Sequence, residues 1–309
     1  MIKKILDKIN LFKLLRYNVI FNFSKKVSGL PLANKGLDFI LSYSRSNFIS
    51  YFIRPKYSKN FELISTEKID LKEFGIIIQG PVSNKNELNF LRETLKIYEK
   101  IFPKTLIIIS TWENSYTEDL EDSEYIKIHK SKLPNEPGLA NINYQIKSTS
   151  NAIKILKKEG IKNILKTRTD CRLMKPNLKS YFLSLQKTFN SENSEYSRIF
   201  ASSIATCKYR IYGLTDILLF GKTEEMEIYF KDETESEILK NYSFERIINE
   251  TALMSEILLC ARYLKNKGIK LDWTLEHWWH CLAKNFGIID VNSLDFFWYK
   301  YDWNFEQRF

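Results

Sequence analysis

Short apolar runs alternate with amphipathic stretches along the chain from about residue 71. Apolar runs bounded by Gly, Pro or polar clusters are typical of buried strands, and they predict strands at 74–82, 105–110, 125–130 and 161–166. Asn84, with Glu87 three residues later, has the pattern of a helix N-cap and starts a helix that ends before Pro103. A second amphipathic pattern predicts a helix near 142–158.

The rest of the chain continues the pattern less regularly, with a helix expected at 177–189, a strand at 198–204, an apolar run at 212–221 and a helix at 250–266. Alternating strands and helices predict an α/β fold with a Rossmann-type, mostly parallel central sheet and flanking helices. In such sheets ligands bind outside the carboxyl ends of the strands. The segments of interest are therefore Gln79–Pro81, Ser110–Asn114 and Thr167–Arg172.

Positive charge is concentrated at the start of the chain. The formal net charge is +10, and residues 1–60 hold twelve Lys or Arg against two Asp, so the remainder is neutral overall. The stretch "MIKKILDKINLFKLLRYNVIFNF" has apolar residues near helical spacing and lysines on the other face. We expect a basic amphipathic segment over 1–65 that either lies on a membrane surface or docks on its own domain. No recognisable nucleic-acid module is present, so nucleic acid is not an expected partner.

The cysteines and the lack of export or membrane-spanning signals indicate the cellular compartment. The four cysteines match no metal-ligand spacing, so reduced and mostly buried thiols are expected. Neither a secretory signal nor a run of about 18 uncharged apolar residues occurs. We therefore expect a cytoplasmic protein that lies peripherally at the inner face of the inner membrane.

Charged residues follow directly on one predicted strand, in "NILKTRTDCRLMKP" at 163–176. In an extended segment Arg168, Asp170 and Arg172 would project to the same side. A carboxylate can hold a divalent cation on phosphate oxygens, and guanidinium groups bind the same oxygens in bidentate fashion. The motif predicts a diphosphate site, and a surface ion-pair cluster is the alternative.

Three stretches resemble a known family: "IIIQGPV", "LPNEPGLANINYQIKSTSNAIKILKKEGIKNILKTRTDCRL" and "YGLTDILLFG". Together they are similar to the WavE lipopolysaccharide-synthesis family of bacterial glycosyltransferases of GT-A type, over about residues 72–300. The resemblance implies a GT-A-like domain over 66–309 that transfers a sugar from a nucleotide-diphosphate donor. The acceptor would be a lipid-linked or lipopolysaccharide-type bacterial surface glycan. It would belong to the core of lipopolysaccharide or lipooligosaccharide, or to the capsule.

Roles for particular residues follow from that resemblance. Gln79, Gly80 and Pro81 would contact the nucleotide, and "RTD" stands where such enzymes carry an Asp-x-Asp motif that binds Mn²⁺ or Mg²⁺. Arg168 replaces the first acid, so Asp170 remains as the metal ligand and Arg168 can itself supply positive charge.

Further polar residues are candidates for sugar binding and catalysis. Amide groups at a helix start can bind sugar hydroxyls or phosphate, which makes Asn141, Asn143 and Gln145 candidates. An acceptor hydroxyl needs a base, and the candidates are Asp216, Glu250 and, as a weaker one, Glu256. With Asp216 or Glu250 as base the reaction is expected to invert the anomeric centre. His277 and His280 have a spacing that could share a metal, but packing in the aromatic tail is the favoured role.

Two other functions stay open. The same phosphate site would suit a nucleotidyl- or phosphotransferase. A non-catalytic, membrane-associated scaffold that binds sugar nucleotides is the third reading, and a buried, ion-paired Asp170 would favour it.

Overall fold

The computed structural model describes residues 72–118, 120–189, 197–242 and 254–301. The predicted basic segment 1–65 and the candidate base Glu250 lie outside these residues. The described part contains no helix long and apolar enough to cross a membrane.

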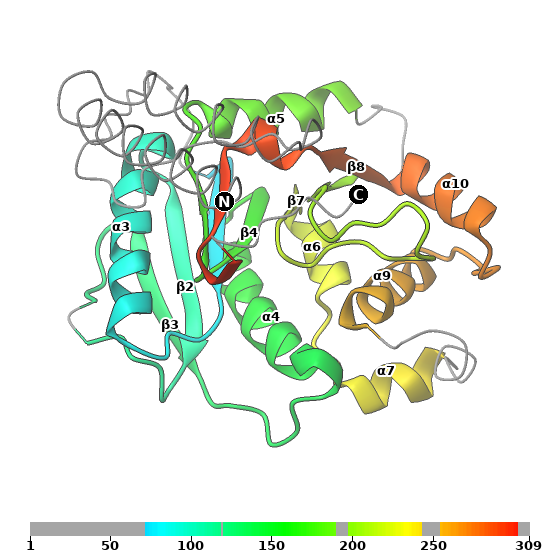
Figure 1. The fold of residues 1–309 in the computed structure, drawn as a ribbon, viewed down its shortest axis with the longest axis horizontal. Helices are drawn as coiled ribbons and strands as arrows, with labels where there is room; N and C mark the ends of the chain where they lie inside the picture. Colours follow the sequence, from blue (N-terminus) through cyan, green and yellow to red (C-terminus); the bar gives the residue numbers. More distant parts are fainter. Residues whose placement is uncertain (1–71, 119, 190–196, 243–253, 302–309) are drawn as a thin grey trace, which may run out of the picture. The chain divides into compact units, whose positions relative to one another are not determined.

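A seven-stranded sheet forms the centre of the described domain (Figure 1). Its strand order is β3-β2-β1-β4-β7-β6-β8. The strands β1 to β4 are mutually parallel, β6 and β8 are parallel to each other, and β7 is antiparallel to both of its neighbours. The strands are β1 (Phe74–Gln79), β2 (Leu106–Trp112), β3 (Ile126–Ser131), β4 (Asn163–Arg168), β6 (Ile199–Ser202), β7 (Leu219–Lys222) and β8 (Phe286–Ile289).

Helices cover both faces of this sheet, because the strands bury apolar side chains on each side. On one face α3 (Lys85–Ile101) and α5 (Leu178–Phe189) pack against alternate strand residues such as Ile76 and Ile78. The other face packs on α4 (Ile142–Lys158) through residues such as Ile77. It is also covered by α6 (Thr223–Tyr229), α7 (Glu235–Tyr242), α9 (Ser255–Asn266) and α10 (Leu275–Asn285).

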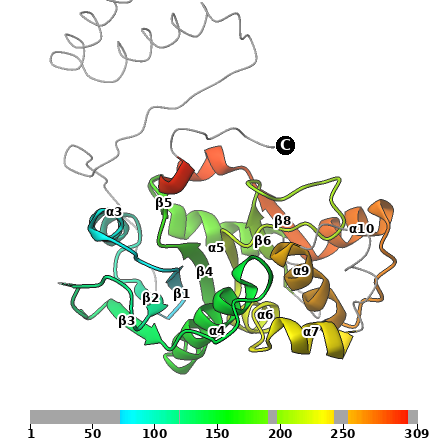
Figure 2. The same cartoon turned by 60° about the horizontal axis from the view of Figure 1, so that its bottom comes forward.

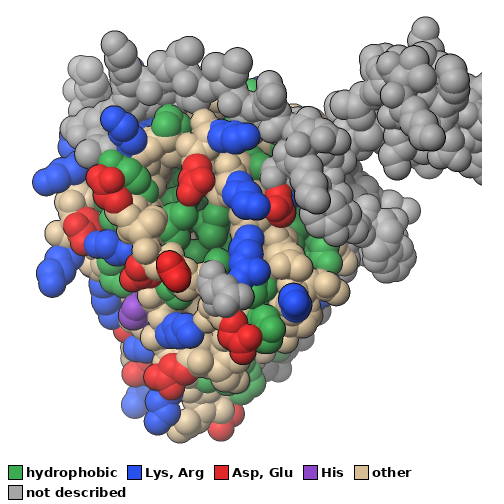
Figure 3. Space-filling view, turned by 90° about the vertical axis from the view of Figure 1, so that its left-hand side faces the viewer, with side chains coloured by type: hydrophobic (Ala, Val, Ile, Leu, Met, Phe, Trp, Pro, Cys, Tyr) green, Lys and Arg blue, Asp and Glu red, His purple; other side chains and the backbone are tan. Residues whose placement is uncertain are grey.

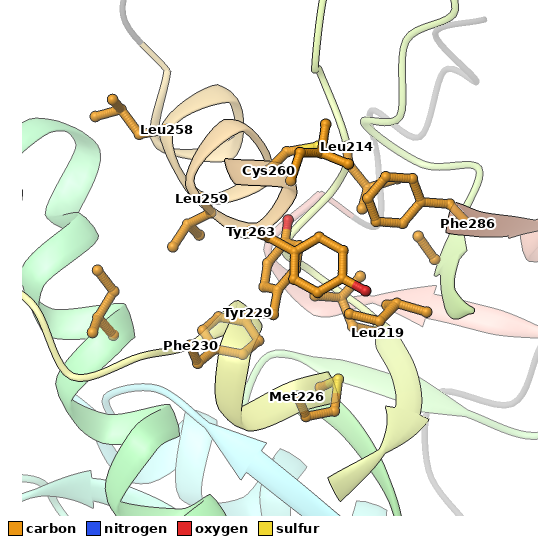
Figure 4. Packing of buried hydrophobic residues seen from close by; sticks show 14 of the residues in the cluster. Leu214, Leu219, Met226, Tyr229, Phe230, Leu258, Leu259, Cys260, Tyr263 and Phe286 are labelled. Atoms are coloured by element: carbon orange, nitrogen blue, oxygen red, sulfur yellow. The ribbon is translucent and has the colours of Figure 1, made fainter. Parts of the chain in front are cut away.

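Aromatic packing fixes α6 and α9 against the β7 side of the sheet (Figure 4). The Tyr229 and Tyr263 rings lie 5.3 Å apart, and Phe286 lies 5.6 Å from Tyr263. All three side chains are buried, so this cluster holds α6, α9 and β8 together.

A small second sheet ties the C-terminal part of the described chain to the end of β4. The strand β5 (Cys171–Leu173) follows a turn after β4 and pairs antiparallel with β9 (Phe296–Trp298). Figure 2 shows the red C-terminal elements beside β5. A residue near the end of the chain therefore reaches the motif that follows β4.

The predicted fold class is confirmed as a mixed α/β protein with a mostly parallel sheet and flanking helices. The Asn84 N-cap is confirmed, since its side chain accepts hydrogen bonds from the backbone N–H groups of Asn86 and Glu87, each at 3.0 Å. Strand β1 ends at Gln79, because Gly80 and Pro81 turn the chain away from the sheet.

Candidate active site

Strand order reverses its direction beside β1. The chain passes from β1 outward to β2 and β3, and then returns to the other side of β1 to form β4. Outside the carboxyl ends of two such strands a crevice forms, where ligands of open α/β sheets bind. The register pairs Gln79 with Arg168, so the two predicted segments do meet at this point.

The ends of β1 and β4 are locked together through Gly80 and Thr169. The Thr169 N–H donates to the Gln79 carbonyl at 3.0 Å, and its hydroxyl donates to the Pro81 carbonyl at 2.9 Å. Gly80 has φ +138°, and a Cβ at this position would lie 2.7 Å from Thr169 Oγ1. Only glycine fits this close approach without strain. The arrangement leaves Pro81 exposed at the mouth of the crevice and Gln79 mostly buried beneath it.

Arg168 and Asp170 form a bidentate ion pair at the end of β4. The guanidinium Nε and Nη2 donate to the two carboxylate oxygens at 2.8 and 2.9 Å. The Trp298 indole N–H also donates to Asp170, at 3.0 Å, and the Trp298 ring centroid lies 5.6 Å from the Arg168 guanidinium. Burial alone would raise the pKa of Asp170, but the hydrogen bonds and charge of Arg168 outweigh it and hold that pKa below its usual value. Asp170 is therefore an anion whose oxygens are already engaged.

Arg172 does not share this site, and the prediction that the three charged side chains project to one side is wrong. A turn at Thr169 and Asp170 interrupts the extended chain between β4 and β5, so the alternation is lost. The Arg172 side chain is fully buried, donates to Thr94 Oγ1 at 3.0 Å and to the Phe90 carbonyl at 2.9 Å, and stacks on the Phe90 ring. These contacts attach β5 to α3, and they leave no room for Arg172 to bind a phosphate.

The three amide candidates at the start of α4 separate in the structure. Asn141 is exposed, with a left-handed backbone, and its side chain makes no capping bond. Asn143 is buried and uses both ends of its amide inside the protein, on the Glu136 carbonyl at 3.1 Å and the Glu235 N–H at 2.6 Å. These contacts connect the loop before α4 to the start of α7. Gln145 alone points toward the sheet edge, where its amide donates to the Asp216 carboxylate.

A second charged cluster surrounds Asp216, in the loop before β7. Lys166, on β4, is fully buried and donates its ammonium group to the Asp216 carbonyl. Burial lowers the pKa of Lys166 to about 8, although the charge of Asp216 offsets part of the shift. Burial, and secondly the charge of Asp216, raise the pKa of Glu256 at the start of α9. The charge of Asp216, in the loop before β7, therefore acts on Glu256 at the start of α9.

Two residues of this region were not predicted from the sequence. Lys166 lies in a run that the sequence predicts as a strand buried on both faces. A lysine in such a run is itself a signal, because a buried ammonium group needs a polar partner. Trp298 lies 128 residues from Asp170 in sequence, so no local pattern could connect them.

The histidines and cysteines do not form a metal site. His277 Nδ1 hydrogen-bonds the Tyr212 hydroxyl at 2.8 Å, and His280 is exposed. All four cysteines are free thiols, and Cys207 alone is more than slightly exposed. Among the described residues no three His, Cys, Asp or Glu side chains come together to hold an ion.

The Asp170 carboxylate is already engaged by neighbouring donors. Both of its oxygens accept from Arg168, and one also accepts from Trp298, so a divalent cation would have to share these oxygens or displace the guanidinium. The guanidinium already occupies the place where a cation would bind the carboxylate. Positive charge at this strand end is therefore supplied by Arg168.

A pocket of about 400 Å³ with both polar and apolar lining residues does not include the Arg168 motif. It is bordered by the loop after β3, the first turns of α4 and the loop before α7, and both Lys147 and Asp232 line it. These two side chains pair with each other at 3.3 Å. On the face shown in Figure 3, basic and acidic side chains are likewise interspersed. Neither the pocket nor this face concentrates charge of one sign.

The fold and this sheet edge define the class of an α/β protein with a topological switch point, the place where ligands of such sheets bind. The chain belongs to the WavE lipopolysaccharide-synthesis family, whose match covers residues 74–294. This confirms the family resemblance found from the sequence, and membership supports the prediction of a glycosyltransferase.

Comparison with other proteins adds little to the family match. No curated protein matches the chain. Among solved structures, the chain is similar to "a glycosyltransferase involved in the glycosylation of the major capsid of PBCV-1", at 9% identity and a TM-score of 0.37. That superposition covers 71% of this chain and 82% of the other.

Proposed function

We propose that the protein transfers a sugar from a nucleotide-diphosphate donor to a bacterial surface glycan of the lipopolysaccharide, lipooligosaccharide or capsule type. One observation carries the proposal: β4 ends in a partly exposed arginine, and Lys166 of the same strand holds the loop that carries the Asp216 carboxylate. Sugar transfer needs a cationic group for the departing diphosphate and a base for the acceptor hydroxyl. Family membership supports the surface-glycan acceptor.

On the donor side, Arg168 is proposed to bind the diphosphate. Its pairing with Asp170 uses Nε and Nη2, and a guanidinium has five N–H donors in all. The ion pair and the Trp298 ring hold the group in one orientation, so little side-chain freedom is lost when phosphate binds. The neighbouring Gln79–Pro81 turn is proposed to contact the nucleotide.

On the acceptor side, Asp216 or Glu256 is proposed as the base. A base works best when its pKa lies near the working pH, and the pKa of Glu256 is shifted in that direction. Asp216 is held by Gln145 and would orient the acceptor or accept its proton directly. If either carboxylate takes the proton of the acceptor hydroxyl, the acceptor oxygen attacks the anomeric carbon as the nucleoside diphosphate leaves. A single such step would give a product of inverted configuration.

Membrane association stays a proposal based on the N-terminal composition. The basic amphipathic segment 1–65 would bring the enzyme to the inner face of the inner membrane, where lipid-linked acceptors are found.

The test is a transfer assay with UDP-, GDP- and ADP-sugars, with and without Mn²⁺, on the truncated glycan of a strain that lacks this gene. Release of a nucleoside diphosphate together with a lengthened glycan is expected. Release of pyrophosphate or a nucleoside monophosphate would instead establish a nucleotidyl- or phosphotransferase. Asp216→Asn and Glu256→Gln should each lower turnover at least a hundredfold, whereas Glu159→Gln, at an exposed ion pair far along α4, should not.

The scaffold alternative is favoured by one feature, since Asp170 is ion-paired and its side chain is only 18% exposed. It requires that no donor be turned over although a sugar nucleotide binds. Thermal shift with the same donors but no product in the transfer assay would establish it.

A further inference from the structure

Two aromatic side chains contact each other on the surface, away from the Arg168 motif. Tyr209 is 69% exposed and Trp279 is 39% exposed, and their rings lie 6.1 Å apart at 80°. The Lys208 ammonium lies 5.5 Å from the Tyr209 ring and 5.4 Å from the Trp279 ring. We call these three residues the aromatic platform. Single exposed apolar residues are common on proteins, but an adjoining pair under one cation is not random scatter.

The platform is rigid before any ligand binds. The indole N–H groups of Trp278 and Trp279 donate to the carbonyls of Cys207 and Lys208, at 3.2 and 2.8 Å. The loop is also closed on itself, since the Cys207 N–H donates to the Gly213 carbonyl at 3.0 Å. Rigid aromatic surfaces bind with a low entropy cost, because few rotamers are lost.

The platform lies on chain segments that also lead to the two candidate bases. Tyr209 and Asp216 belong to the same loop between β6 and β7, which passes beside α9 and α10 (Figure 1). Arg210 in this loop donates to the sulfur of Met254 at 2.8 Å, two residues before Glu256. Both chain segments that carry a candidate base therefore also border the platform.

We propose that the aromatic platform binds the acceptor glycan, an oligosaccharide that carries at least one acidic group. One face of a pyranose ring presents C–H groups, which pack favourably on the electron-rich face of an aromatic ring. Lys208 places positive charge over the two rings, and this charge complements a phosphate or carboxylate on the glycan. The proposal rests on the proposed function, since the carboxylates mark the side of the site to which an acceptor must come.

The experiment measures glycan binding and donor turnover separately. The truncated glycan of a strain that lacks this gene is deacylated and titrated into the full-length protein by calorimetry. Tyr209→Ala and Trp279→Ala should each weaken binding about tenfold, as expected for the loss of one stacked ring. Trp279→Phe keeps a ring and should recover much of the loss. Lys208→Gln should weaken binding most at low salt, because charge pairing is screened by salt.

Controls separate this proposal from the proposed function and from misfolding. Phe189→Ala removes an aromatic side chain that is 53% exposed on α5, outside the platform, and should bind glycan like wild type. Thermal unfolding of Tyr209→Ala at the wild-type temperature should confirm that this variant is folded.

Three outcomes would overturn the proposal. Equal glycan binding by wild type and Tyr209→Ala would refute the platform, while transfer activity would leave the proposed function standing. Absence of glycan binding by wild type would refute both the platform and the proposed acceptor. Loss of binding to vesicles of phosphatidylethanolamine and phosphatidylglycerol in Tyr209→Ala, with glycan binding kept, would assign the patch to a membrane surface.

Discussion

Replacing Asp170 by Asn tests whether the motif after β4 works through a fixed arginine. Asn keeps the size of the side chain but loses the charge, so it cannot accept both Arg168 N–H groups and the Trp298 N–H as an anion does. We expect a less stable protein in which the Arg168 side chain is less ordered. Donor affinity should fall because the guanidinium is no longer held in one orientation.

The magnitude follows from how far the pair is buried. Exposed ion pairs contribute about 0–1 kcal/mol, and breaking fully buried pairs costs about 3–5 kcal/mol. With side-chain exposures of 31% for Arg168 and 18% for Asp170, we expect an intermediate loss of about 2 kcal/mol. For a domain of this size that corresponds to a fall in Tm of roughly 4–8 °C.

The assay combines urea unfolding with initial rates of transfer. For Asp170→Asn, KM for the donor should rise about tenfold, with a smaller change in kcat, because the guanidinium is less well oriented. The folded-state pKa of Asp170 is lowered, so its contribution to stability is present above the unfolded pKa near 4. The difference between variant and wild type should shrink as pH falls below about 4.

Two further variants serve as controls for Asp170→Asn. Glu159→Gln breaks the exposed Lys127–Glu159 pair, at 41% and 45% exposure, and should lose less than about 1 kcal/mol with full activity. Trp298→Phe removes one donor to Asp170, and its effect should not add to that of Asp170→Asn, because both act on one network. Wild-type stability together with unchanged donor KM in Asp170→Asn would refute the reasoning.

Three other substitutions should each change a different measured property. Lys166→Met should remove a pH dependence of stability. Burial lowers the folded-state pKa of Lys166 to about 8, so the free energy of unfolding of the wild type should rise by about 3 kcal/mol between about pH 8 and 10. Urea titrations of the variant should lack this rise. Gly80→Ala should lower the free energy of unfolding by about 1–3 kcal/mol and remove most transfer activity, because the new Cβ would lie 2.7 Å from Thr169 Oγ1 at a positive φ. A stable and active variant would contradict the close packing of the two strand ends. Arg172→Met should change stability, by thermal unfolding, without changing donor KM in the folded fraction, because its buried guanidinium bonds α3 groups and stacks on Phe90. A raised donor KM at normal stability would show that Arg172 does act in the site.

Local patterns in the sequence determined the secondary structure and the class of fold. The apolar run before Gly80 had to form a buried strand, and Asn84 had to start a helix, because both signals depend only on near neighbours. The same logic located the crevice, since carboxyl ends of parallel strands lie on one edge of a sheet.

Tertiary structure decided which side chains face that crevice. The turn at Thr169 and Asp170 sends Arg172 into the core against Phe90, although alternation along the sequence placed it beside Arg168. Trp298 reaches Asp170 only because β9 pairs with β5. Side-chain direction after a turn, and contacts between residues far apart in the chain, depend on backbone geometry and packing that no short stretch of sequence contains.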